Sequence, residues 1–226
     1  MTLNLTMTNL DHGDPNLGGL FDTLQGNILK SLGRDHSRHV RLRFTGPPEA
    51  CRALVAGFAD QVTSMSAQYA QTCAYRDHGT RSLFTGFLLS AAGYDALGIP
   101  RADQPNDPAF QAGMKDISTP YDTRPRGDHT RNPNPLNDAP DGWEDGFQAR
   151  IDALVILASG RKDDTEGTEE MLHYELEKLT DSVRGLAEIV HVEFGHVLRN
   201  DLGQVIEHFG NPDGVSNPSF MRPDLD

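Results

Sequence analysis

The sequence has little cysteine and little positive charge. Cys51 and Cys73 are its only cysteines among 226 residues, and they form neither a CxxC pair nor a metal-ligand spacing. This excludes a disulfide scaffold and cysteine-based chemistry. There are 20 Lys and Arg against 33 Asp and Glu, a net charge of −13, so phosphate backbones and anionic lipid surfaces would repel the chain. We therefore expect no nucleic-acid partner and no membrane partner.

Long apolar runs are absent as well. No run approaches the roughly 18 residues of a membrane span, and the first dozen residues lack the basic and apolar regions of a secretion signal. These absences favour a cytoplasmic protein. Glycine and proline, by contrast, are common, at 22 and 14 residues, which indicates many loops.

Apolar periodicity predicts a set of strands and helices. Residues 39–44 alternate between apolar and polar side chains, as in a half-buried strand. The continuous apolar run at 151–158 is typical of a central strand. Apolar stripes at helical spacing predict helices over about 48–64 and 168–185. Further strands are predicted at 83–89, 189–198 and 204–209.

The predicted order is strand, helix, strand, long loop, strand, helix, strand and a final hairpin. This order is typical of an α+β protein with a ferredoxin-like antiparallel sheet and its helices on one face. We divide the chain into a flexible lead-in (1–20), one ferredoxin-like domain (21–209) and a C-terminal segment (210–226). A long loop without periodicity is predicted at 100–142.

Two groups of polar residues on the predicted strands are candidates for a metal site and for a charged binding surface. His191 and Glu193 share one face of a strand, but no third ligand stands at a recognised metal-site spacing, so no metal site is predicted. The basic stretch at 30–43 predicts a solvated strand face, although it could also attract an anionic substrate or an acidic partner.

The strongest local feature is the stretch 210–218. Taken locally, its Asn-Pro-Asp-Gly sequence at 211–214 predicts a type I turn, because proline presets φ and glycine closes the turn. The same stretch, with Gly210 followed by Asp213 and Gly214, resembles the GxxDG signature of the dye-decolourising (DyP-type) haem peroxidases. Further stretches are similar to bacterial and cyanobacterial members and stand in the family's order: 24–30, 33–36, 87–90, 113–115 and 187–191.

The resemblance implies a fold of two ferredoxin-like halves, in a dimeric α+β-barrel-like arrangement, with haem b between them. Asp213 would be the distal aspartate, which acts with a distal arginine to move a proton between the two oxygens of hydrogen peroxide. Asp213, Gly214, Val215 and Ser216 would lie against the haem. A carboxylate held in a turn can do this if its site tunes its pKa. The second substrate would be a small aromatic reductant, such as a phenol or a dye.

The sequence departs from the family pattern in two ways. Residues 211–212 are Asn-Pro, where the family usually has an aromatic residue after the first glycine. The family's proximal histidine and distal arginine both follow the motif, whereas no histidine follows Gly214 here and Arg222 is too close to the motif to match. His208 is the nearest substitute ligand, but ligation there would block the position of peroxide.

We therefore expect the chain to be the N-terminal half of a DyP-type peroxidase, carrying Asp213 and inactive alone. Haem would bind only when a C-terminal half is present. Two alternatives remain open: a non-catalytic ferredoxin-like binding module, and one subunit of a split peroxidase whose partner supplies the other half. The isolated half should keep an apolar surface near 209–220 and should self-associate.

Overall fold

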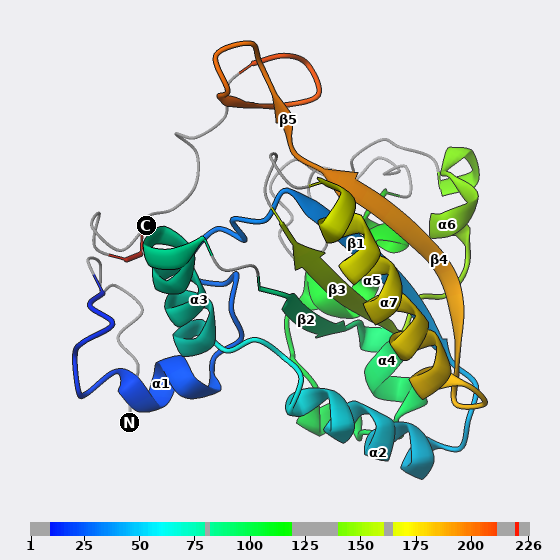
Figure 1. Cartoon of the computed structure of the whole chain (residues 1–226). Coiled ribbons are helices and arrows are strands. Elements are labelled where there is room, and N and C mark those ends of the chain that lie inside the picture. The colour runs from blue at the N-terminus through cyan, green and yellow to red at the C-terminus, as the bar shows by residue number, and fades with distance from the viewer. Residues whose placement is uncertain (1–9, 80–81, 119–139, 161–164, 212–219, 222–226) are drawn as a thin grey trace, which may run out of the picture.

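The computed structural model describes residues 10–79, 82–118, 140–160, 165–211 and 220–221. Its main body is one four-stranded antiparallel sheet in the spatial order β2-β3-β1-β4 (Figure 1). The strands are β1 (His36–Phe44), β2 (Phe84–Leu89), β3 (Ala153–Ser159) and β4 (Ala187–His196).

Two helices make the crossovers of this sheet. Helix α2 (Pro48–Ala59) lies in the connection from β1 to β2, and helix α7 (Thr165–Val183) joins β3 to β4. The resulting β-α-β-β-α-β order is that of the ferredoxin-like fold. The predicted fold class is therefore confirmed.

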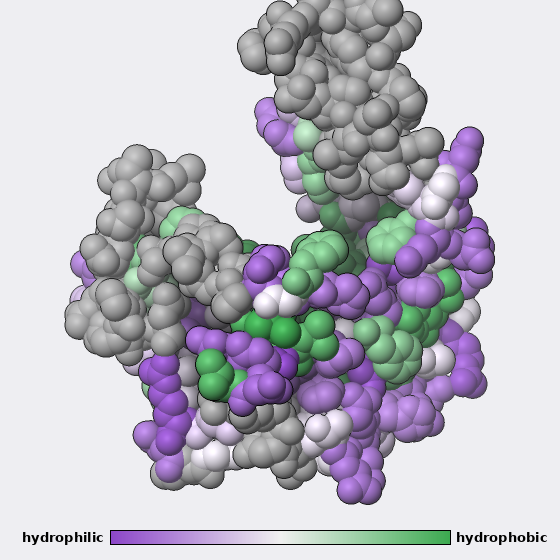
Figure 2. Space-filling model, turned by 90° about the horizontal axis from the view of Figure 1, so that it is seen from above, coloured by the Kyte–Doolittle hydropathy of each residue, from purple (hydrophilic) through white to green (hydrophobic). Residues whose placement is uncertain are grey.

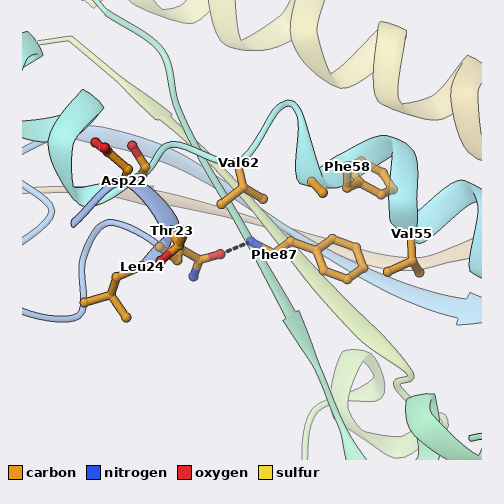
Figure 3. A pocket seen from close by; sticks show the side chains of 10 residues that line it. Asp22, Thr23, Leu24, Val55, Phe58, Val62 and Phe87 are labelled. Carbon is orange, nitrogen blue, oxygen red and sulfur yellow. Dashed lines mark hydrogen bonds between the residues drawn. The ribbon is translucent and has the colours of Figure 1, made fainter. Parts of the chain in front are cut away.

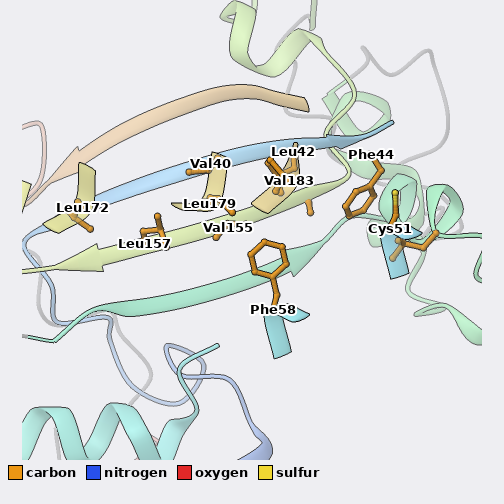
Figure 4. Close-up of a cluster of buried hydrophobic side chains, with 12 residues drawn as sticks. Val40, Leu42, Phe44, Cys51, Phe58, Val155, Leu157, Leu172, Leu179 and Val183 are labelled. Carbon is orange, nitrogen blue, oxygen red and sulfur yellow. The ribbon is translucent and has the colours of Figure 1, made fainter. Parts of the chain in front are cut away.

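Both crossover helices cover the same face of the sheet, as predicted. Alternate side chains of β1 and β3 point toward this face and meet the apolar stripes of α2 and α7 (Figure 4). The fully buried Leu42 lies in the middle of this cluster. The labelled members of the cluster are Val40, Leu42, Phe44, Cys51, Phe58, Val155, Leu157, Leu172, Leu179 and Val183.

A second, smaller core lies beside the sheet. Helix α1 (Gly18–Thr23) packs against helix α3 (Met65–His78), and the buried residues between them include Leu17, Phe21 and Met65. Leu10 and Met221 complete this core. Residues 10–20, which we expected to belong to a flexible lead-in, thus contribute buried side chains here.

Helix α2 ends at Ala59, short of the predicted end near residue 64. The chain turns because the amides of Gln61 and Val62 both donate to the carbonyl oxygen of Phe58, at 2.9 and 3.0 Å. Ser64 then caps α3 by accepting a hydrogen bond from the amide of Ala67. Val62, which continued the apolar stripe in sequence, therefore lies outside the helix.

The remaining helices are short and lie mostly between β2 and β3. Helix α5 (Pro108–Ser118) falls inside the predicted loop at 100–142, and its helical geometry is interrupted at Gly113 (φ 73°). The short elements η1 (Arg101–Asp103) and η2 (Pro140–Gly142) also fall inside this predicted loop, whereas α4 (Ala91–Ala96) precedes it and α6 (Asp145–Gln148) follows it. The predicted loop is therefore partly helical.

Figure 2 shows that apolar side chains at the upper end of the molecule form small patches separated by hydrophilic residues. In the part of the chain that the structure describes, no helix is long and apolar enough to cross a membrane.

Candidate functional site

The candidate site follows a small hairpin that leaves the end of β4. Its strands are β5 (Leu198–Arg199) and β6 (Val205–Ile206), and they confirm the predicted hairpin in a shorter form. We call residues 198–211 the hairpin arm. It stands away from the main body in Figure 1. Three of its apolar side chains are exposed: Leu202 at 83%, Val205 at 42% and Phe209 at 88%.

The arm ends in a tight turn directly before the predicted site residues. The amide of Glu207 donates to the carbonyl oxygen of Asn211, and the amide of Gly210 donates to that of Glu207, both at 2.9 Å. Gly210 has a φ of +84°, which a residue with a side chain rarely adopts. The backbone conformation at the first position of the motif therefore favours glycine. Asp213, Gly214, Val215 and Ser216 lie outside the described residues.

The chain beyond the site residues is fixed to the second core. The amide of Leu10 donates to the carbonyl oxygen of Phe220 at 2.8 Å, and Leu10 and Met221 form a parallel bridge. Met221 is buried among Leu17, Phe21 and Met65. The predicted site residues therefore connect two parts of the fold, the hairpin arm and the second core.

An ion pair holds the base of the arm. Both oxygens of the Asp35 carboxylate accept hydrogen bonds from Nη2 of Arg199, at 2.8 and 2.9 Å. The side chain of Asp35 is largely buried and that of Arg199 is partly buried. Because Asp35 directly precedes β1, this pair joins the arm to the first strand of the sheet.

Two of the three arginines of β1 do not lie on the predicted solvated face, whereas the side chain of Arg43 is 41% exposed. Arg38 and Arg41 are only 3% and 7% exposed. Arg38 points toward the helices and pairs with Glu169 of α7, which also accepts from His36 at 2.9 Å. The prediction was wrong because carboxylates of other elements neutralise these cations.

These contacts change how readily Glu169 loses its proton. Partial burial of its carboxylate tends to raise the pKa of Glu169, but the hydrogen bond and positive charge of Arg38, with the charge of His36, outweigh burial. The pKa of Glu169 is therefore lowered from its ordinary value. The group stays ionised at neutral pH and ties α7 to β1.

Arg41 lies on the face of the sheet opposite α2 and α7. Its guanidinium pairs with Glu193 of β4 and stacks on the ring of Phe147 in α6, 3.8 Å from the ring centroid. The nearby His191 ring packs against Gly146, where an added Cβ would come within 2.7 Å of it. Glu193 thus binds Arg41. Within the described residues, no three metal-ligating side chains form a group.

His39 is half-buried on this same face. Its burial lowers the pKa of His39, the nearby charge of Glu193 opposes this effect, and that of Arg41 adds to it. The result is a pKa below the ordinary histidine value, so His39 is neutral at pH 7. On this face the neutral imidazole of His39 thus lies near the guanidinium of Arg41, whose charge is balanced by Glu193.

A cavity of about 300 Å³ lies between the two cores (Figure 3). Its apolar wall includes Val55, Val62 and the stacked rings of Phe58 and Phe87, whose centroids are 4.9 Å apart. Asp22 lies at its polar side. The volume is at the small end of the range for ligand pockets. None of its lining residues belongs to the segment 198–221.

Comparison with known proteins identifies the family. No family model matches the chain. The chain is 31% identical over 214 residues to the multifunctional dye peroxidase DyP2 of Amycolatopsis sp., and the alignment covers 92% of this chain. The structure of a DyP-type peroxidase from Anabaena sp. matches 98% of this chain with a TM-score of 0.80 at 36% identity. This chain matches the N-terminal half of DyP-type peroxidases.

A second solved member of the DyP-type family supports this assignment. DyP2 from Amycolatopsis sp. matches 97% of this chain with a TM-score of 0.76 at 27% identity. The chain spans less than half the length of its relatives: 39% of the curated DyP2 sequence, 44% of the Anabaena chain and 42% of the DyP2 chain. It corresponds to the N-terminal half of these proteins.

Three of the histidines in the part of the chain that the structure describes have well-defined surroundings. His36 is paired with Glu169, His191 packs against Gly146, and His208 lies exposed on the arm. No histidine lines the cavity between the cores. The geometry instead fixes both ends of the segment that carries the predicted site residues.

Proposed function

We propose that this chain forms the N-terminal part of a haem-dependent DyP-type peroxidase and supplies Asp213 as its distal acid–base residue. The observation that carries the proposal is the identity of 31% to 36% with DyP-type peroxidases over more than nine-tenths of the chain. The substrates would be hydrogen peroxide and a small aromatic reductant.

The chemical role that we propose for this chain is proton transfer. Haem b, when bound, would supply the two electrons that cleave the O–O bond of hydrogen peroxide. The carboxylate of Asp213 would accept the proton of one peroxide oxygen and return it to the other oxygen, which would leave as water. Gly214, Val215 and Ser216 would line the edge of the haem, where the glycine permits close approach of the backbone.

A proton relay of this kind needs a fixed distance between the carboxylate and the two oxygens. The attachment of the segment supports this requirement, because the turn at Glu207–Asn211 precedes Asp213 and the bridge at Met221 follows it. The segment between these anchors is short. Its ends are held by the hairpin arm and by the second core.

The iron-ligating histidine and the distal arginine would come from sequence that matches the remaining part of the relatives. The exposed apolar side chains of the arm, Leu202, Val205 and Phe209, support such a partner surface. That remaining part could belong to the same polypeptide or to a separate subunit, as in a split enzyme. In either case we propose that haem binds only when both parts are present.

The test is Asp213→Asn in a protein that combines this chain with the remaining part of a relative. Loss of a general acid–base group typically slows the step about 10²- to 10⁴-fold. We expect the reaction with peroxide to slow by this amount in stopped-flow measurements, while the Soret band is unchanged. The matched control is Asp201→Asn, in the exposed turn of the arm, which should react like the unmodified protein. Equal rates for all three proteins would refute the role of Asp213.

A further inference from the structure

The orientation of the hairpin arm depends on few contacts. Among the helices and strands that the structure describes, β5 and β6 have extensive contacts only with each other. The hydrogen bonds at Asn200 and Glu207 close turns within the arm. For the described chain, the side-chain hydrogen bonds that join the arm to the main body are the two from Arg199 to Asp35.

Asp35 is itself fixed at the end of the sheet. Its amide donates to the carbonyl oxygen of Gly160, just after β3, at 3.5 Å. Its carbonyl oxygen accepts from the amide of Val197, the last residue before the arm, at 2.8 Å. The carboxylate of Asp35 therefore projects from a point where three strands meet, directly beside the base of the arm.

Both carboxylate oxygens of Asp35 accept from the same guanidinium nitrogen, Nη2 of Arg199, so the contact is a charge-assisted hydrogen bond. Arg199 also donates to the carbonyl oxygen of Gly203 across the hairpin, at 3.3 Å. One side chain thus connects the turn of the arm to the end of the sheet. Limited exposure of Asp35 protects the pair from screening by solvent.

We propose that Asp35 and Arg199 are a positioning pair that sets the orientation of the hairpin arm and, through it, the position of Asp213. The pair touches neither peroxide nor haem. The part of this inference that concerns Asp213 rests on the proposed function. The part that concerns the arm does not, and it can be tested in the 226-residue chain without haem.

The first test is hydrogen exchange of the chain by mass spectrometry. Asp35→Asn removes the charge at nearly constant shape, and Arg199→Lys keeps the charge but changes the geometry of donation. Both should accelerate exchange of amides in 198–211 about 10- to 100-fold, the range expected for losing hydrogen bonds to a charged group. Amides of β1 and α7 should keep their rates. The control is Asp181→Asn on α7, which breaks an exposed ion pair with Arg184, the residue that follows the helix.

The second test measures orientation directly. Spin labels at Leu202 on the arm and at Glu177 on α7, both exposed, report the arm-to-body distance, with Cys73 replaced by serine to prevent labelling there. We expect one narrow distance distribution, which Arg199→Lys should broaden. Unchanged exchange and unchanged distances would overturn the proposal. Equal acceleration over the whole chain would also overturn it, because the pair would then contribute only general stability.

The connection to Asp213 has its own readout. In the two-part haem protein, Asp35→Asn and Arg199→Lys should lower kcat/KM for peroxide without changing the Soret band or the KM for the reductant. If the arm loosens but the peroxide step keeps its rate while Asp213→Asn slows it, the positioning role is wrong and the proposed function stands. If Asp213→Asn also has no effect, the proposed function itself fails.

Discussion

Replacing Leu42 by alanine tests the main core. Leu42 is fully buried in β1, between Ala153 of β3 and Ile189 of β4, and it faces the helix-covered side of the sheet. Truncation of a buried leucine removes apolar contacts and leaves a cavity, at a cost of about 2–5 kcal/mol in the free energy of unfolding. With helices on this face and strands on both sides, the site has little freedom to collapse, so we expect about 3 kcal/mol or more.

The assay is urea unfolding followed by circular dichroism, together with a thermal scan. For a chain of this size a loss of about 3 kcal/mol lowers Tm by about 6–12 °C, at roughly 2–4 °C per kcal/mol. The matched control is Leu202→Ala on the arm, the same substitution at an exposed position, which should change stability by less than about 0.5 kcal/mol. Equal midpoints for the two variants would refute the assignment of the core.

The other predictions concern packing, pH and association. Gly93→Ala would place a Cβ 2.0 Å from the backbone oxygen of Asp152 and should lower Tm strongly, whereas Gly57→Ala meets no atom within 4 Å and should raise helix stability by about 0.5–1 kcal/mol. Because the pKa of Glu169 is lowered on folding, its contribution is present above the ordinary value of 4.5 and is lost as pH falls below it. Glu169→Gln should therefore make stability less dependent on pH in that acidic range, as measured by urea unfolding. The chain should self-associate in sedimentation velocity runs, and Phe209→Ser should shift it toward the monomer; a clean monomer before substitution would contradict this.

The sequence predicted the sheet well because its strands and crossover helices have strong apolar patterns. The alternation at 39–44 and the apolar run at 151–158 correspond to β1 and β3, which lie together in the middle of the sheet. Helix α3 was missed because its side chains are mostly small or polar, and its stability comes from tertiary contacts. Gln68, for example, is buried and accepts from the amide of Asn27 while donating to the carbonyl oxygen of Ser31.

The second core was missed for a different reason. Leu10, Leu17 and Phe21 are spaced too irregularly to indicate one element, and Met221 joins them from the far end of the sequence. Long-range pairs leave no periodic signal. The same holds for Asp35 and Arg199, which are 164 residues apart. The motif at 210–214 was found only because it resembles a family signature, since local rules predict no more than a turn.

Titration with haemin tests the central claim most directly. The chain alone and an equimolar mixture with the remaining part of a relative are titrated under the same conditions, and the Soret band is followed. Our account predicts weak or no binding by the chain alone, and stoichiometric binding with peroxide turnover by the mixture. Stoichiometric binding and full peroxide turnover by the chain alone would contradict it, because the iron ligand would then have to lie within these 226 residues.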